Sequence, residues 1–189
     1  MLLLDKIISA LSDLVVVLPK KNRENRKEIR EVVLSVQSEM ERAIELAILY
    51  IDGTKRVIPE QELVDHLTGA SSKLMASYNE FKICAGLYGL ADRFDEVFSS
   101  IKGSINYGQI KAVEDLIRDL GNGESLVIDG LRDVTEKMYT YGSELSNLSG
   151  DDFNKKKIEA LERIELEVIS MRSQLVLFRK SVKEILKLM

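Results

Sequence analysis

The chain has 189 residues, of which 45% are apolar and 31% charged, so it is long enough to bury a core and too apolar to be disordered. Its formal net charge of −4 gives no global reason to expect a nucleic-acid partner. The single cysteine, Cys84, excludes a disulfide within the chain and suits a reducing compartment. The first residues, MLLLD, lack the basic segment of a secretory signal, so we expect a cytoplasmic protein.

Apolar residues recur at alternating steps of three and four along most of the chain, a pattern typical of amphipathic and coiled-coil helices. The repeating segments are Leu4–Leu18, Ile29–Tyr50, Leu63–Ala91, Val127–Leu148 and Leu161–Met189. A less regular zone follows from Gly86, where AGLYG either bends the third helix or lets another helix approach closely, and a shorter helix is expected over Ile105–Leu120. The pattern predicts an all-α, antiparallel up-and-down helical bundle of four long helices and one or two shorter ones, forming a single domain over residues 1–189.

The first segment leads into a proline and a basic run, LVVVLPKKNRENRKEIR over residues 14–30. On a helix, the apolar residues of this segment share one side, and the opposite side is polar and net acidic. A membrane-spanning helix takes about 20 mostly apolar residues, and this segment is shorter and carries charges. We therefore interpret it as a helix that lies against the bundle.

Between residues 20 and 31 there are six Lys or Arg and three Glu, at the start of the second helix. One interpretation is a solvated first turn of mixed charge. The other rests on the helix dipole, which disfavours positive charge at a helix N-terminus, so that the basic residues are kept for an anionic partner. The residues of this candidate contact are Lys20, Lys21, Arg23, Arg26 and Lys27.

Two features indicate how the helices are arranged. The second helix ends in AIELAILYI, which is apolar on nearly every face and predicts a central position. The last helix, Asp152–Met189, is about 57 Å long at 1.5 Å per residue, whereas the helix before it, Glu124–Leu148, is about 38 Å long. The first helix, the bent part of the third helix or another copy of the chain must cover the difference.

Residues that could support catalysis or bind a metal are few. His66 is the single histidine, and with nearby Glu62, Asp65 and a lone cysteine it does not make a usual zinc or di-iron site. Cys84 lies eighteen residues after His66, about 27 Å along a straight helix, which excludes a catalytic dyad of the two. The segment GNGES, at residues 121–125, lacks the P-loop lysine and reads as a flexible corner. The sequence predicts a protein that is not an enzyme and that uses no metal or cofactor.

The last helix carries apolar residues beyond its main repeat, and basic residues near its C-terminus that suit the helix dipole. Three explanations stay open: the first helix folds back over this end, a second copy pairs with it, or a different protein binds it. The candidate self-association face consists of Val176, Leu177, Leu186 and Leu188, with Ile169 as a further apolar residue outside the repeat.

We therefore expect a non-catalytic interaction or assembly module whose partner is another protein or a second copy. The alternative is a peripheral membrane-binding or membrane-perturbing bundle that uses the first helix and the basic segment 20–30. A membrane surface is not favoured, because helices that lie on membranes usually carry basic residues on their polar face. Nucleic acid is not expected either, because the tyrosines are not interleaved with Lys and Arg.

Overall fold

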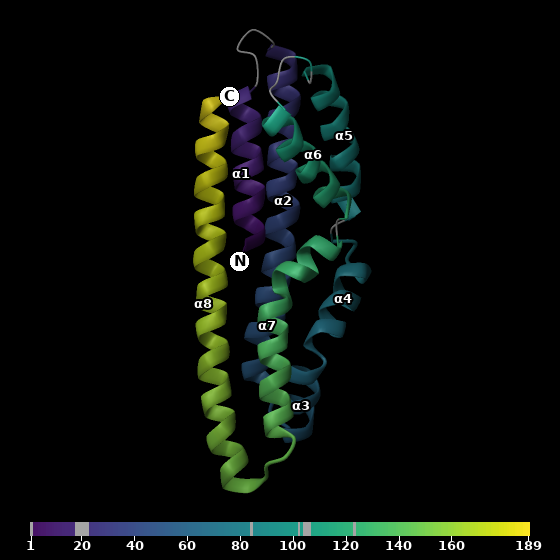
Figure 1. The fold of residues 1–189 in the computed structure, drawn as a ribbon. Helices are drawn as coiled ribbons and strands as arrows, with labels where there is room; N and C mark the ends of the chain where they lie inside the picture. Colours follow the sequence, from purple (N-terminus) through teal and green to yellow (C-terminus); the bar gives the residue numbers. More distant parts are fainter. Residues whose placement is uncertain (1, 18–22, 84, 102, 104–106, 123) are drawn as a thin grey trace.

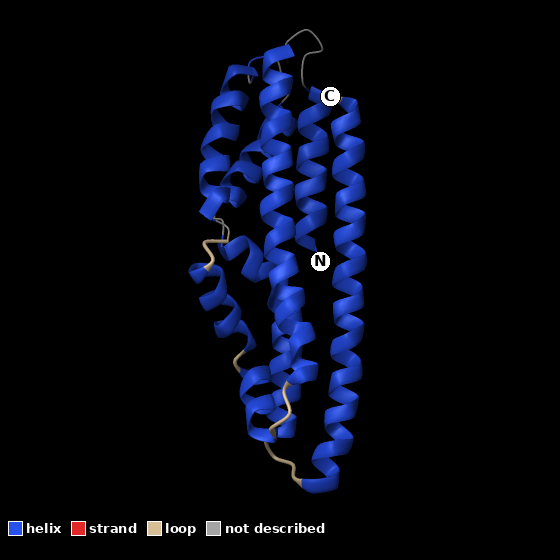
Figure 2. Ribbon diagram, turned by 180° about the vertical axis from the view of Figure 1, so that it is seen from behind, coloured by secondary structure: helices blue, strands red, loops and turns tan. Residues whose placement is uncertain are grey.

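The computed structural model describes residues 2–17, 23–83, 85–101, 103, 107–122 and 124–189. Over these residues the chain forms eight α-helices and one 3-10 turn, and it contains no strand (Figure 2). The elements are α1 (Leu2–Val17), α2 (Arg23–Gly53), η1 (Thr54–Arg56), α3 (Glu60–Thr68), α4 (Ala70–Glu80), α5 (Ala85–Ile101), α6 (Tyr107–Gly121), α7 (Glu124–Leu145) and α8 (Gly150–Leu188). The predicted all-α helical bundle is confirmed.

The molecule is elongated, and α8 runs along one side of it for nearly its whole length (Figure 1). A loop at the lower end joins α7 to α8, so the chain reverses direction there, while α1 runs upward beside the upper half of α8. Helices α1, α2 and α7 all contact α8. The part of α8 that α7 is too short to reach is therefore covered by α1. The sequence analysis left three possibilities for this part, and the first helix was one of them.

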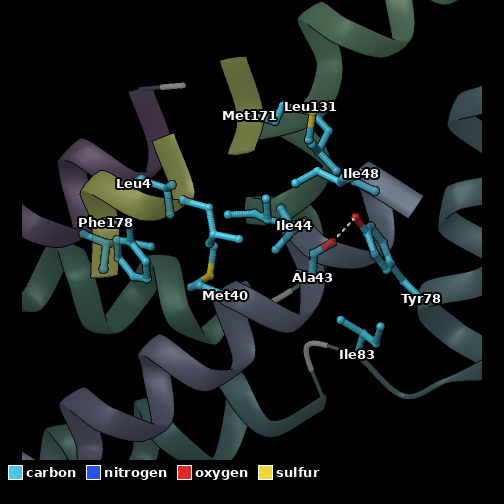
Figure 3. Packing of buried hydrophobic residues seen from close by; sticks show 14 of the residues in the cluster. Leu4, Met40, Ala43, Ile44, Ile48, Tyr78, Ile83, Leu131, Met171 and Phe178 are labelled. Carbon is cyan, nitrogen blue, oxygen red and sulfur yellow. Dashed lines mark hydrogen bonds between the residues drawn. The ribbon is translucent and has the colours of Figure 1, made fainter. Parts of the chain in front are cut away.

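Helix α2 lies at the centre, as its apolar C-terminal half predicts. It contacts α4, α5, α7 and α8, and its Ala43, Ile44 and Ala47 are fully buried. Buried side chains from every described α-helix join the same apolar cluster, part of which is drawn in Figure 3. There Tyr78 of α4 points at α2, and its hydroxyl donates a hydrogen bond of 2.9 Å to the Ala43 carbonyl.

The predicted third helix is divided into three. Helix α3 ends at Thr68, and α4 ends at Glu80 in a turn over residues 81–83, where Lys82 has a φ of 49°. A bend at Gly86–Gly89 is not found, because α5 passes through both glycines without interruption. At Gly86 an added Cβ would lie 2.9 Å from the Glu39 carboxyl group of α2. Gly86 thus allows close approach of α2, the second role that the sequence left open.

The outer face of α8 as a candidate interaction surface

Helix α8 has two apolar faces on opposite sides. The inner face packs into the core through Phe153, Ala160, Ile164, Val168, Met171, Leu175, Phe178, Val182 and Ile185. The outer face, which we call the outer stripe, consists of Ile158, Leu166, Ile169, Val176, Leu177 and Leu188, each between 52% and 65% exposed. Eleven residues make about three helical turns, so Ile158 aligns with Ile169, and Leu166 aligns with Leu177 and Leu188. Charged residues interrupt the stripe near its ends, with Glu162 between Ile158 and Leu166, and Lys180 and Glu184 between Leu177 and Leu188.

The middle of the outer stripe, from Leu166 to Leu177, has no charge facing outward. The two charged residues of this stretch turn sideways to neighbouring helices. Glu167 accepts a hydrogen bond of 2.8 Å from Lys137 of α7, and Arg172 lies 3.4 Å from Asp52 of α2. Between the exposed apolar side chains lie only serines on the outward side, Ser170 and Ser173. This stretch presents an apolar surface about three turns long.

Ion pairs lie on both edges of α8, between its inner face and the outer stripe. Toward α2, Arg179 binds Glu41 and Glu45 at 2.9 and 2.6 Å. Toward α7, the hydrogen bonds of Lys137 to Glu167 and Asp133 raise the pKa of that lysine. Each exposed pair adds only about 0–1 kcal/mol of stability. The nine buried side chains of the inner face set the rotation of α8, and the ion pairs border the outer stripe on both edges.

The candidate self-association residues do not all belong to this surface. Val176, Leu177 and Leu188 lie in the outer stripe, together with Ile169. Leu186 is partly buried and packs against the core. Ile158 and Leu166 extend the stripe toward the N-terminus of α8, and sequence reasoning missed them. The eleven-residue spacing was the signal that could have identified both.

The basic residues are placed differently from one another. Lys20 and Lys21 lie outside the described residues, and the side chain of Arg23, the first residue of α2, is not described either. Lys27 is exposed. Arg26 is partly buried, and its Nη1 donates a hydrogen bond of 3.0 Å to the Met189 carbonyl, which joins the start of α2 to the end of α8. Part of the Arg26 side chain is therefore engaged within the chain.

His66 takes part in a small polar group where α2, η1 and α3 meet. Its Nε2 lies 3.1 Å from Oγ1 of the buried Thr54, and its ring stacks on Tyr50 at 4.3 Å between centroids. The Tyr50 hydroxyl donates 2.8 Å to the His66 carbonyl, and burial raises the pKa of Tyr50 to about 12. Burial, with a smaller contribution from Lys73, lowers the pKa of His66. This group connects α2 to α3.

Neither neighbouring carboxylate supports a metal site at His66. Glu62 and Asp65 are exposed, and Asp65 accepts a hydrogen bond from Gln61. Across the described part of the chain, no cluster of three or more His, Cys, Asp or Glu residues could hold a metal ion. Cys84, the other candidate, lies outside the described residues, as does Gly123 of the GNGES corner.

Comparison with known protein families, with curated proteins and with solved structures finds no match to this chain. Within the described ranges, no helix is both long enough and apolar enough to cross a membrane.

Proposed function

We propose that this protein is a non-catalytic helical-bundle interaction module, and that the outer stripe of α8 is its contact surface. The observation that carries the proposal is the double amphipathicity of α8, with a core face and an opposite apolar face. A helix needs only one apolar face to pack on a bundle, so the second face is not required by the fold.

The energetics of the outer stripe favour burial against a partner. Completing the burial of an exposed Leu, Ile or Val side chain is favourable by about 1.5–3 kcal/mol at most. Six such side chains, already more than half exposed, therefore offer several kcal/mol before the costs of association are counted. Single exposed apolar residues are ordinary on a protein surface, whereas several adjacent ones, as from Leu166 to Leu177, are typical of an interaction site.

A photo-cross-linking experiment in intact cells tests the proposal. A photoreactive residue replaces Ile169 inside the stripe, and a matched control carries it at Tyr139 of α7, which is 58% exposed and outside the stripe. We expect discrete protein adducts from position 169 and none from position 139. Equal labelling at both positions, or no adduct at position 169, would contradict the proposal.

Peripheral membrane binding is the rival proposal, and its apolar component lacks support. Leu4, Ile7 and Leu11 of α1 are at most 3% exposed, and α1 packs against α6 and α8. A bilayer contact through α1 would require this helix to leave the core. Sedimentation with vesicles of anionic lipid at low salt distinguishes the proposals, and we expect the chain to stay in the supernatant.

A further inference from the structure

We infer that the outer stripe of α8 binds the same stripe of a second copy, with the two α8 helices antiparallel about a two-fold axis near Ser173. The inference rests on the proposed function and names its partner. A two-fold dimer requires a surface that is complementary to itself when one copy is turned end over end. The charges and the apolar side chains of α8 both meet this condition.

The charges at the two ends of the uncharged stretch have opposite sign. Glu162 and Glu165 precede it, and Lys180 and Lys183 follow it, at similar distances from Ser173. An antiparallel arrangement brings the two glutamates of one copy to the two lysines of the other, at both ends of the interface. A parallel arrangement would place like charges side by side, which is unfavourable.

Most of these charges are available for such contacts. Within the described part of the chain, Glu162, Lys180 and Lys183 make no ion pair. Oε1 of Glu165 lies 3.1 Å from Nζ of the exposed Lys55, which also pairs with Asp52. Two charges of contrary sign lie nearby, but both are already paired. Arg163 binds Glu159 at 2.8 Å, and Glu184 binds Lys187 at 2.8 Å. The acidic and basic ends therefore keep their net signs.

The apolar side chains match under the same rotation. It sets Ile169 of one copy beside Val176 of the other, and Leu166 beside Leu177, on the two lateral sides of the contact. Ser170 and Ser173 lie between these pairs. Their small side chains allow the helix axes to approach closely, and the separation of packed helices depends on the side chains at the contact. The apolar centre and the charged ends form one surface.

Charge reversal tests the partner. Light scattering of the unmodified chain should give twice the 21.4 kDa mass of one copy. We expect Lys180→Glu with Lys183→Glu to weaken the dimer by roughly tenfold or more, and Glu162→Lys with Glu165→Lys to do the same. Mixing the two variants in equal amounts should restore dimers, because each mixed pair joins two acidic ends to two basic ends. The control, Lys111→Glu with Arg118→Glu, reverses two exposed charges of α6, which packs on α1 and α5, and should dimerise normally.

Cysteine cross-linking tests the orientation in chains with Cys84→Ser. Leu166→Cys and Leu177→Cys lie eleven residues apart, about 16.5 Å along α8. In the antiparallel dimer neither variant should form a disulfide with itself, and a mixture of the two should form one. Self-cross-linking of each variant alone would overturn the antiparallel arrangement. A monomeric unmodified chain at high concentration would overturn the dimer, whereas adducts to other proteins at position 169 would leave the proposed function standing. A monomer without any adduct would refute both.

Discussion

Gly142 of α7 provides a sharp test of how closely α7 and α3 pack. It is buried, and an added Cβ would lie 2.7 Å from Thr68 Cγ2, 2.9 Å from Leu67 Cβ and 3.0 Å from the Thr68 amide nitrogen. The last two atoms are fixed to the α3 backbone, so a change of rotamer cannot move them away. Gly142→Ala must therefore separate the two helices.

The sign of the effect is diagnostic because alanine is normally favourable in a helix. Overpacking costs typically about 1–3 kcal/mol, and replacing glycine by alanine in a helix gains about 1 kcal/mol. We expect a net loss of up to about 2 kcal/mol in the free energy of unfolding for Gly142→Ala. Gly89 of α5 is the matched control, because no atom lies within 4 Å of its added Cβ. Gly89→Ala should gain about 0.5–1 kcal/mol.

Urea denaturation followed by far-ultraviolet circular dichroism measures both changes. The midpoint should move down for Gly142→Ala and up for Gly89→Ala, with an unchanged dependence on urea concentration in both variants. If Gly142→Ala is as stable as Gly89→Ala, the close approach of α3 and α7 is wrong.

Two further predictions concern hydrogen bonds of the core and its edge. Tyr78→Phe removes the buried hydroxyl that donates to the Ala43 carbonyl, and it should lower the free energy of unfolding by about 0.5–1.5 kcal/mol, whereas Tyr139→Phe at an exposed site should leave urea denaturation unchanged. Folding lowers the pKa of His66 below its ordinary value of 6.5, so the unfolded chain binds the proton more readily than the folded chain. The contribution of neutral His66 to the free energy of unfolding should therefore be complete above about pH 6.5. It should decrease as the pH falls from 6.5 toward the pKa of His66 in the folded chain. In denaturation series at both sides of that pH, His66→Asn should lose less stability on acidification than the unmodified chain, and an equal loss would refute the role of His66.

The core of the long helices could be predicted from the sequence because helical periodicity is a local property. In α8 the expected repeat names Ile164, Val168 and Met171, and all three are buried at 1–2% exposure. Leu4, Ile7 and Leu11 of α1 follow in the same way. Each of these positions is decided by which residues share a side of one helix, and no knowledge of the neighbouring helix is needed.

The divisions of the third helix could not be predicted in the same way. The apolar spacing continues across Gly69 and across residues 81–83, so it gives no sign that the chain turns there. The repeat over Leu63–Ala91 steps from Leu74 through Ser77 to Phe81 and predicts that Phe81 is buried. Phe81 is instead 52% exposed, because α4 ends one residue earlier and the backbone turns at Lys82. Tyr78, outside the expected repeat, is buried in its place. Tertiary packing decides these positions.

The outer stripe was predicted in part. A second apolar face is visible on a helical wheel, but the wheel does not show whether a neighbouring helix packs against that face. The first helix was one of three open explanations for the apolar end of the last helix, and α1 does contact α8. It does not reach the opposite side of α8, where Leu177 and Leu188 stay exposed. Which face a neighbour covers depends on contacts between distant segments, and periodicity contains no information on these.

The same substitution on the two sides of α8 should therefore have different consequences. Leu177 is 61% exposed, so Leu177→Glu should change the free energy of unfolding by less than about 0.5 kcal/mol. Leu186 packs against the core, so Leu186→Glu should cost about 1–3 kcal/mol, because a charge enters a partly apolar site. Association should respond in the opposite order, with Leu177→Glu abolishing the dimer in light scattering while circular dichroism stays unchanged. A folded and stable Leu186→Glu chain that has lost its dimer would instead place Leu186 in the contact surface and refute the orientation of α8.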